Sequence, residues 1–205
     1  MADDLVLTGV QVCHLLYDLE ACDRAHGWAI FNQYLDSRAM YAAVGPRWLV
    51  WLGARLECPG ALGAACDMVS LWLAQQPQDE PGVVAALQAL GVVIRWRRGL
   101  ETREGLLSLW RSAIDNKAIH PIHGGEPALY LAKCLGYAAY YASRPRMYVD
   151  EVAFAAVEVD RIVGVCLSEG AIVNNEVAAE VVRRHLPYEV LATVAAKFQA
   201  EQPAE

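Results

Sequence analysis

Residues 102–115 show the pattern that decides the fold class. They read Thr-Arg-Glu-Gly-Leu-Leu-Ser-Leu-Trp-Arg-Ser-Ala-Ile-Asp. Leu106, Leu109 and Trp110 follow the three- and four-residue spacing that places side chains on one face of an α-helix. Thr102 precedes them, where its hydroxyl can cap the first turn. The stretch therefore predicts an amphipathic helix.

The same spacing recurs along the whole chain, with Pro and Gly at most of the boundaries. Further helices are expected over about residues 12–22, 30–44, 48–57, 61–76, 83–98, 127–143, 148–169, 175–185 and 189–200. Thr8 is a possible cap and Gly27 a possible stop for the first of these, while Val92-Val93-Ile94 would also suit a strand. The prediction is an all-α fold of about ten helices, packed as antiparallel hairpins. No linker or charge run divides residues 1–205, so one domain is expected, with its last few residues disordered.

Composition supports a sizeable core. Of the 205 residues, 56% are hydrophobic and 20% are charged, and a chain of this size buries roughly 70% of its extended-state surface. Charged residues or Gly interrupt every apolar stretch before the roughly 18 residues that a membrane span requires. The start, Met1-Ala2-Asp3-Asp4, lacks the positive region of a secretory signal. A cytoplasmic protein is expected.

The cysteine pattern indicates the redox state of the thiols, and the net charge limits which kinds of partner are expected. The cysteines, which form no Cys-x-x-Cys pair, are Cys13, Cys22, Cys58, Cys66, Cys134 and Cys166. They are expected to be reduced and mostly buried. A formal net charge of −7 disfavours nonspecific binding to nucleic acid or to anionic lipid, and it favours a basic protein partner.

The irregular segment from Asn116 to Glu126 contains the best candidates for a chemical site. His120 and His123 could share a metal ion with Asp115 or Glu126. Pro121 between the histidines excludes the helical H-x-x-x-H arrangement of zinc proteases. The other interpretation is an ordinary loop between helices, and both stay open.

Acidic and tyrosine side chains are the candidate contacts to a protein partner. These are Asp18, Glu20, Asp23, Asp79, Glu80, Tyr137, Tyr140 and Tyr141. Carboxylates can meet a basic surface, and tyrosine combines apolar area with a hydrogen-bonding tip. The acidic residues could equally form a solvated face, and the tyrosines could serve internal packing.

Common catalytic motifs are missing from the sequence. It contains no P-loop, no G-x-G-x-x-G, no G-x-S-x-G and no EF-hand loop. The basic cluster around Arg95, Arg97 and Arg98 is most simply explained as favourable charge at the end of a helix. No cofactor and no catalytic residue are assigned.

From Cys66 onward, a series of short motifs resembles a known family. The motifs are Cys66-Asp67, Pro77-Gln78-Asp79-Glu80-Pro81, Trp96-Arg97-Arg98-Gly99, the Ala-rich stretches 131–139 and 152–156, and Leu186-Pro187. In this order they look similar to the all-helical immunity proteins that bacteria encode beside polymorphic toxins. The chain departs from that pattern at Tyr137 and Tyr140, where the family has small residues or His.

The resemblance implies a non-enzymatic immunity or antitoxin-like protein that binds and neutralises a protein toxin. Two alternatives stay open. One is a helical enzyme, or a metal or small-ligand binder, that uses His120 and His123. The other is a helical adaptor or scaffold subunit of a larger assembly, and self-association into a homo-oligomer is compatible with any of the three.

Overall fold

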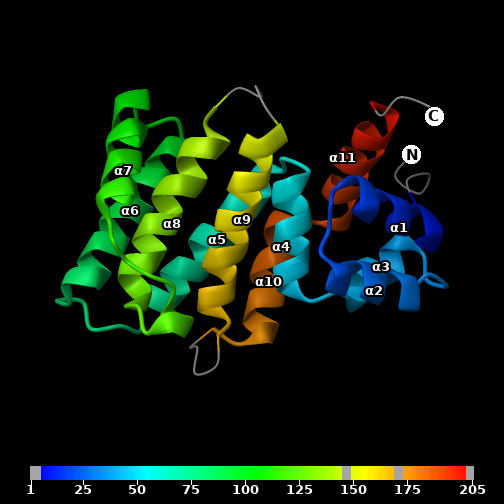
Figure 1. The fold of residues 1–205 in the computed structure, drawn as a ribbon, viewed down its shortest axis with the longest axis horizontal. Helices are drawn as coiled ribbons and strands as arrows, with labels where there is room; N and C mark the ends of the chain where they lie inside the picture. Colours follow the sequence, from blue (N-terminus) through cyan, green and yellow to red (C-terminus); the bar gives the residue numbers. More distant parts are fainter. Residues whose placement is uncertain (1–5, 145–148, 169–172, 202–205) are drawn as a thin grey trace.

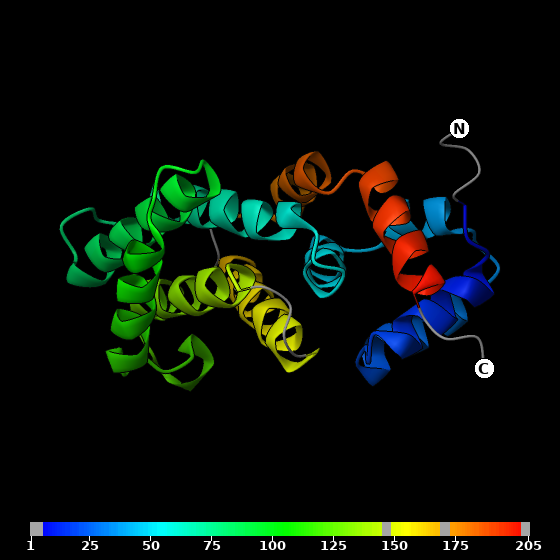
Figure 2. The same cartoon turned by 90° about the horizontal axis from the view of Figure 1, so that it is seen from above.

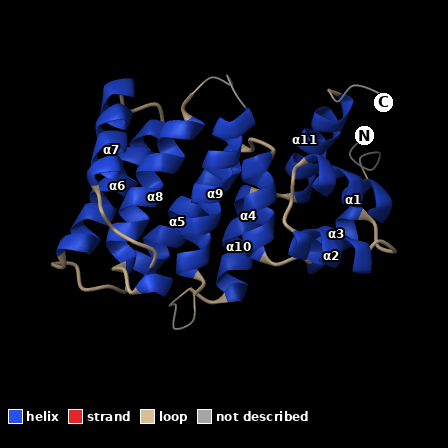
Figure 3. Ribbon diagram, in the orientation of Figure 1, coloured by secondary structure: helices blue, strands red, loops and turns tan. Residues whose placement is uncertain are grey.

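Helices make up the regular secondary structure of the part of the chain that the computed structural model describes, residues 6–144, 149–168 and 173–201. There, eleven α-helices and one 3₁₀-helix occur and no strand. In chain order they are α1 (Gly9–Asp18), α2 (Asp23–Phe31), α3 (Ser37–Ala43), α4 (Pro46–Arg55), α5 (Pro59–Leu73), α6 (Pro81–Arg97), α7 (Arg103–Asp115), η2 (Pro121–His123), α8 (Pro127–Ala142), α9 (Val149–Cys166), α10 (Asn175–His185) and α11 (Tyr188–Ala200). The all-α prediction is confirmed, and the run 92–94 lies inside α6 (Figure 3).

Local capping chemistry explains where most of these helices begin. Proline occupies the first helical position of α4, α5, α6 and α8, where its missing N–H costs nothing. The Thr102 hydroxyl accepts a hydrogen bond from the N–H of Gly105 at 3.1 Å, as predicted. Asn174 caps α10 by accepting from Val177 at 2.8 Å. These boundaries follow directly from the sequence.

The N-terminal helices differ from the prediction. Spacing predicted one helix over residues 12–22 and one over 30–44, whereas the chain forms three shorter helices there. Glu20 has a φ of +54°, a left-handed conformation that ends α1. Gly27 lies inside α2 instead of ending a helix. The buried side chain of Leu19 continues the apolar spacing through the turn, which is why the break was missed.

Helix α8 is the centre of the packing. It contacts α5, α6, α7 and α9, and α9 in turn contacts α4 and α5. Seen from above, α5 and α10 lie on one side of the bundle and α8 and α9 on the other (Figure 2). Helices α1–α3 and α11 occupy the end of the molecule opposite to α6 and α7 (Figure 1).

A single cluster of buried side chains extends from Leu15 of α1 to Ala195 of α11. Its largest fully buried side chains include Met68, Leu131 and Leu135. Small residues allow close approach in the bundle: a Cβ added at Gly136 of α8 would lie 2.6 Å from the Cβ of Ala113 in α7. The helices thus form one compact domain.

The thiols follow the sequence expectation. All six are free; Cys58, Cys66, Cys134 and Cys166 are buried, Cys13 is half-buried and Cys22 is exposed. Burial raises the pKa of Cys58 to about 11 and that of Cys66 to about 12, which suppresses the thiolate. The buried cysteines therefore act as packing residues.

Two expectations concern residues beyond the described ranges. The predicted ends of the helix over 148–169 lie outside those ranges, as do residues 202–205 at the C-terminus. Among the described residues, no helix combines the length and the apolar character that crossing a membrane requires.

Candidate functional site

Large aromatic side chains project from the α1–α2 pair and from the turn that follows it. Tyr17, Phe31 and Tyr34 are 76%, 79% and 76% exposed, and Ile30 beside them is 55% exposed. Sequence spacing predicted one helix over residues 30–44, but α2 ends at Phe31 and α3 begins only at Ser37. We call these four exposed residues, together with Asp18 and Asp23, the α1–α2 outer surface.

Short helices with small inner faces produce this exposure. Helix α1 buries Gly9 and Leu15, and α2 buries Ala25 and Ala29. Gly9 lies close to the backbone that follows α2, since an added Cβ would come 2.1 Å from the carbonyl oxygen of Gln33. Because small residues make the inner contacts, most of the aromatic area of the pair faces outward.

The predicted acidic contacts divide into groups with different surroundings. Asp18 and Asp23 flank the α1–α2 turn and are exposed. Glu20 in the same turn accepts from the Arg55 guanidinium at 2.9 Å, and Arg55 is buried. Glu20 therefore has a structural role as the counter-charge of Arg55.

Asp79 and Glu80 lie in the exposed connection between α5 and α6. They come between helices of the bundle, whereas Asp18 and Asp23 lie at the α1–α2 end (Figure 1). The structure does not bring the five acidic residues into one cluster.

The tyrosines of α8 are engaged in packing within the chain. Tyr140 stacks on Trp110 of α7 with ring centroids 4.2 Å apart. Tyr141 stacks on Phe154 of α9 at 5.4 Å, and Tyr137 is half-buried. These contacts match the interpretation of the tyrosines as packing residues, and they leave less aromatic area for a partner than the α1–α2 outer surface does.

The histidine loop is ordered by local contacts. His120 accepts the N–H of Ile122 at its Nδ1, 3.1 Å away, and its ring lies edge-on to Tyr130 at 4.9 Å. The rings of His120 and His123 are 6.3 Å apart. Burial, followed by the electrostatic interaction with nearby His123, lowers the pKa of His120. Both effects disfavour the protonated form of His120.

The other predicted metal ligands are not arranged around these rings. Glu126 caps α8 by accepting from the N–H groups of Ala128 at 3.0 Å and Leu129 at 2.9 Å. Asp115 is exposed at the end of α7. Across the described residues, no three His, Cys, Asp or Glu side chains form a group that could hold a metal ion.

A buried polar group between α8 and α9 was not predicted. Glu158 is buried in α9 and accepts from Arg161 at 2.5 Å. Burial, together with the charge of Glu158 and a hydrogen bond to it, raises the pKa of the Cys134 thiol. A lone Glu between Val157 and Val159, three residues before Arg161, is the sequence signal for such a pair. Its position between two packed helices points to a structural role.

A second missed contact joins α5 to α10. His185 Nε2 lies 2.7 Å from Asp67 Oδ2, and the guanidinium of Arg184 is 3.7 Å from the same oxygen. Nothing in the spacing of residues 67 and 185 could have revealed this pair, because they are far apart in the chain.

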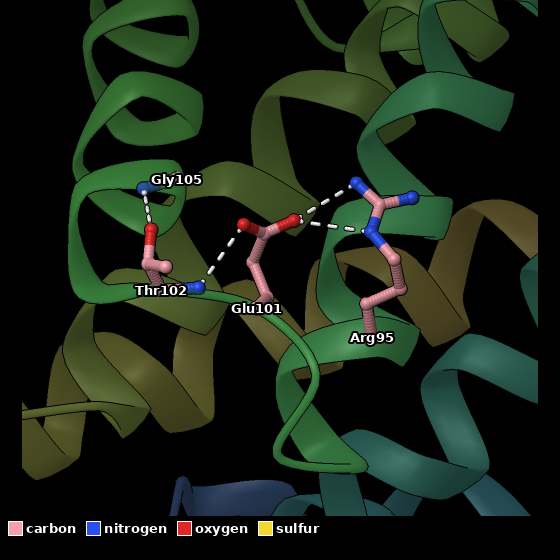
Figure 4. Close-up of polar contacts among 4 residues, drawn as sticks. All are labelled: Arg95, Glu101, Thr102 and Gly105. Atoms are coloured by element: carbon pink, nitrogen blue, oxygen red, sulfur yellow. Dashed lines mark hydrogen bonds and ion pairs between the residues drawn. The ribbon is translucent and has the colours of Figure 1, made fainter.

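The basic residue at the end of α6 has a structural partner. Arg95 donates through two nitrogens to Glu101 at 3.1 and 2.9 Å, and the other Glu101 oxygen accepts from the N–H of Thr102 (Figure 4). Glu101 thus joins the last turn of α6 to the first turn of α7. This geometry agrees with the interpretation of Arg95 as charge at a helix end.

Two hollows adjoin the N-terminal helices. The first hollow, of about 640 Å³, lies among α1, α2, α3, α4 and α11. The second hollow, of about 1030 Å³, is lined by residues that include His120 and Arg161. Trp28, Arg47 and Trp48 line both hollows, and the two indoles meet edge to face at 5.7 Å.

Comparison of the chain with protein-family models, curated proteins and solved structures gives no match. What the site can do is therefore inferred from its own side chains.

Proposed function

We propose that the protein is a non-enzymatic binding protein of the immunity or antitoxin kind, which neutralises a basic toxin by binding it through the α1–α2 outer surface. One observation carries the proposal. Tyr17, Phe31 and Tyr34 each expose more than three quarters of their surface. Aromatic side chains are enriched among the residues that dominate binding energy in protein interfaces.

Charge supports the same surface. Asp18 and Asp23 are exposed next to Tyr17 and at the start of α2, and the whole chain carries a net charge of −7. A basic partner would be attracted over a long range and oriented by these carboxylates, while the aromatic rings supply the contact area. The family resemblance of the later motifs points to the same kind of partner.

Co-expression with the product of a neighbouring gene that stops growth when it is expressed alone tests the proposal. The wild-type chain should restore growth and co-elute with the toxin, and a Tyr17→Ala/Phe31→Ala/Tyr34→Ala variant should lose both. Leu100→Ala/Ile122→Ala is the matched control, because Leu100 and Ile122 are 71% and 79% exposed elsewhere on the surface. Unchanged toxicity with no complex would refute the proposal.

A second candidate function is small-ligand binding at the second hollow. His120 lines this hollow together with Trp48 and Arg161, which places an imidazole beside an aromatic ring and a cation. A His120→Ala/His123→Ala variant that folds and protects normally would remove this candidate. Stoichiometric metal in the purified protein would instead favour it.

A further inference from the structure

The first hollow is a partly open cavity with the volume of a ligand site. Helices α1, α2, α3, α4 and α11 all contribute to its wall. Its volume of about 640 Å³ lies within the range of small-molecule pockets, about 300–1,000 Å³. Leu15, Met40 and Leu191 line it and are nearly buried, so its inner part is apolar and shielded.

Aromatic side chains dominate the wall toward α2 and α4. Trp28, Trp48 and Trp51 all line the first hollow. Indole rings present flat apolar faces and positive edges, so they favour a ligand that can stack or make edge contacts with them. Three indoles around one cavity indicate an aromatic ligand in preference to a purely aliphatic one.

The charges of the lining are largely neutralised within the chain. Arg47 donates Nε and a terminal nitrogen to the two oxygens of Asp160 at 2.6 and 2.7 Å. Glu20 is paired with Arg55 at 2.9 Å, and Arg24 is exposed. An ionised ligand entering the inner part would lose its hydration without gaining a counter-charge there. The inner part of the hollow therefore favours a neutral molecule, while Arg24 adds a positive charge at its exposed edge.

The size of the hollow argues against a polypeptide occupant. An α-helix with its side chains is about 10–12 Å wide, so 640 Å³ holds only about one to two turns. So short a helical segment has little stability of its own. We propose that the first hollow binds a neutral, aromatic small molecule. The proposal is independent of partner binding by the α1–α2 outer surface.

Binding of N-phenylnaphthylamine, a neutral aromatic fluorophore, tests this site. The probe should bind the full-length protein saturably at one site, with energy transfer from tryptophan. Its sulfonated analogue, anilinonaphthalene sulfonate, should bind at least about tenfold more weakly, because its sulfonate would lose hydration on entering the apolar inner part beside Leu15, Met40 and Leu191. Absence of saturable binding by the neutral probe, or equal binding of the sulfonate, overturns the proposal.

Two substitutions on α11 locate the site. Ala192 lines the first hollow and Ala196 does not, and both are half-buried on the same helix. Ala192→Phe should fill the hollow and weaken probe binding by about tenfold or more, whereas Ala196→Phe should change it by less than about twofold. Equal effects of the two substitutions would place the probe elsewhere and overturn the proposal.

Trp51→Leu provides a second measurement if Ala192→Phe fails to fold. Trp51 lines only the first of the two hollows. Loss of its ring should weaken probe binding about two- to tenfold and reduce energy transfer. A folded Trp51→Leu variant, checked by circular dichroism, that binds the probe as tightly as the wild type would refute the proposed site.

Discussion

Helices α8 and α9 differ from α1 and α2 in what their apolar side chains do. Leu131, Leu135 and Ala138 of α8 are buried completely, and Gly136 lets α7 approach closely. Helices α1 and α2 lie at the other end of the molecule (Figure 1). There α2 buries only alanines, and the side chains of Tyr17 and Phe31 are exposed. The difference indicates that the bundle holds most of the fully buried apolar side chains, and the exposed rings at the N-terminal end are the surface on which the proposed partner binding rests.

The largest expected change in stability comes from comparing one alanine substitution at each end of the molecule. Leu131→Ala removes a completely buried side chain and should lower the free energy of unfolding by about 2–5 kcal/mol. Phe31→Ala removes an exposed ring and should change it by no more than about 0.5 kcal/mol. Urea denaturation followed by circular dichroism measures both. Similar losses of unfolding free energy for the two variants would contradict the conclusion that the bundle, and not the exposed α1–α2 rings, stabilises the fold.

A pair of glycine substitutions should have effects of opposite sign. A Cβ at Gly136 would lie 2.6 Å from the Cβ of Ala113, so Gly136→Ala should destabilise the protein by about 1–3 kcal/mol. A Cβ at Gly27 has no described heavy atom within 4 Å, apart from its own helix and chain neighbours. Gly27→Ala should therefore stabilise α2 by about 0.5–1 kcal/mol.

Thermal unfolding of the two glycine variants checks this prediction. The midpoint should fall for Gly136→Ala and rise for Gly27→Ala. A rise for both would mean that α7 and α8 can move apart at little cost.

The same contrast explains how much of the fold could be predicted. Helices α4 to α8 begin at prolines or at Thr102, and local rules place these boundaries well. Helices α1–α3 are joined by turns that a continuous apolar pattern hides, because Leu19 is buried within the turn itself. Periodicity reports apolar spacing, and it cannot distinguish one bent segment from one straight helix.

The candidate site was predictable only in part. Asp18 and Asp23 were identified from charge, but the exposure of Phe31 and Tyr34 was not predicted, since an exposed aromatic stripe and a buried one have the same spacing. Glu126 directly precedes Pro127 at the start of a helix, and that position could have identified it as a cap. Exposure depends on which helices meet, which a single sequence does not show.

The ion pair between Glu20 of the α1–α2 turn and Arg55 of α4 gives a smaller expected effect. Glu20→Gln keeps the side-chain length but removes the charge that faces buried Arg55. Because Glu20 itself is exposed, the loss should be about 1 kcal/mol. Asp23→Asn, an exposed change close by, should stay within about 0.5 kcal/mol. Equal results for the two would remove the structural role of Glu20 and leave it as a candidate partner contact.

The smallest expected effect lies at the opposite end, where Glu101 joins α6 to α7 (Figure 4). Hydrogen bonds from the N–H of Thr102 and from Arg95 lower the pKa of Glu101 below its ordinary value of 4.5. A lowered folded-state pKa means that the carboxylate stabilises the fold above the unfolded value, and that this contribution is lost as pH falls through the folded one.

Glu101→Gln should therefore be less stable than the wild type at about pH 7, and this difference in the free energy of unfolding should shrink as the pH is lowered to about 3. Urea denaturation at several pH values measures that difference, and Glu104→Gln serves as an exposed control in the same turn of α7. The control should leave the pH profile of the wild type unchanged. If Glu101→Gln showed the same pH dependence of stability as the wild type, the charge of Glu101 would not contribute to the link between α6 and α7. Other contacts, such as apolar packing, would then hold this end of the bundle together.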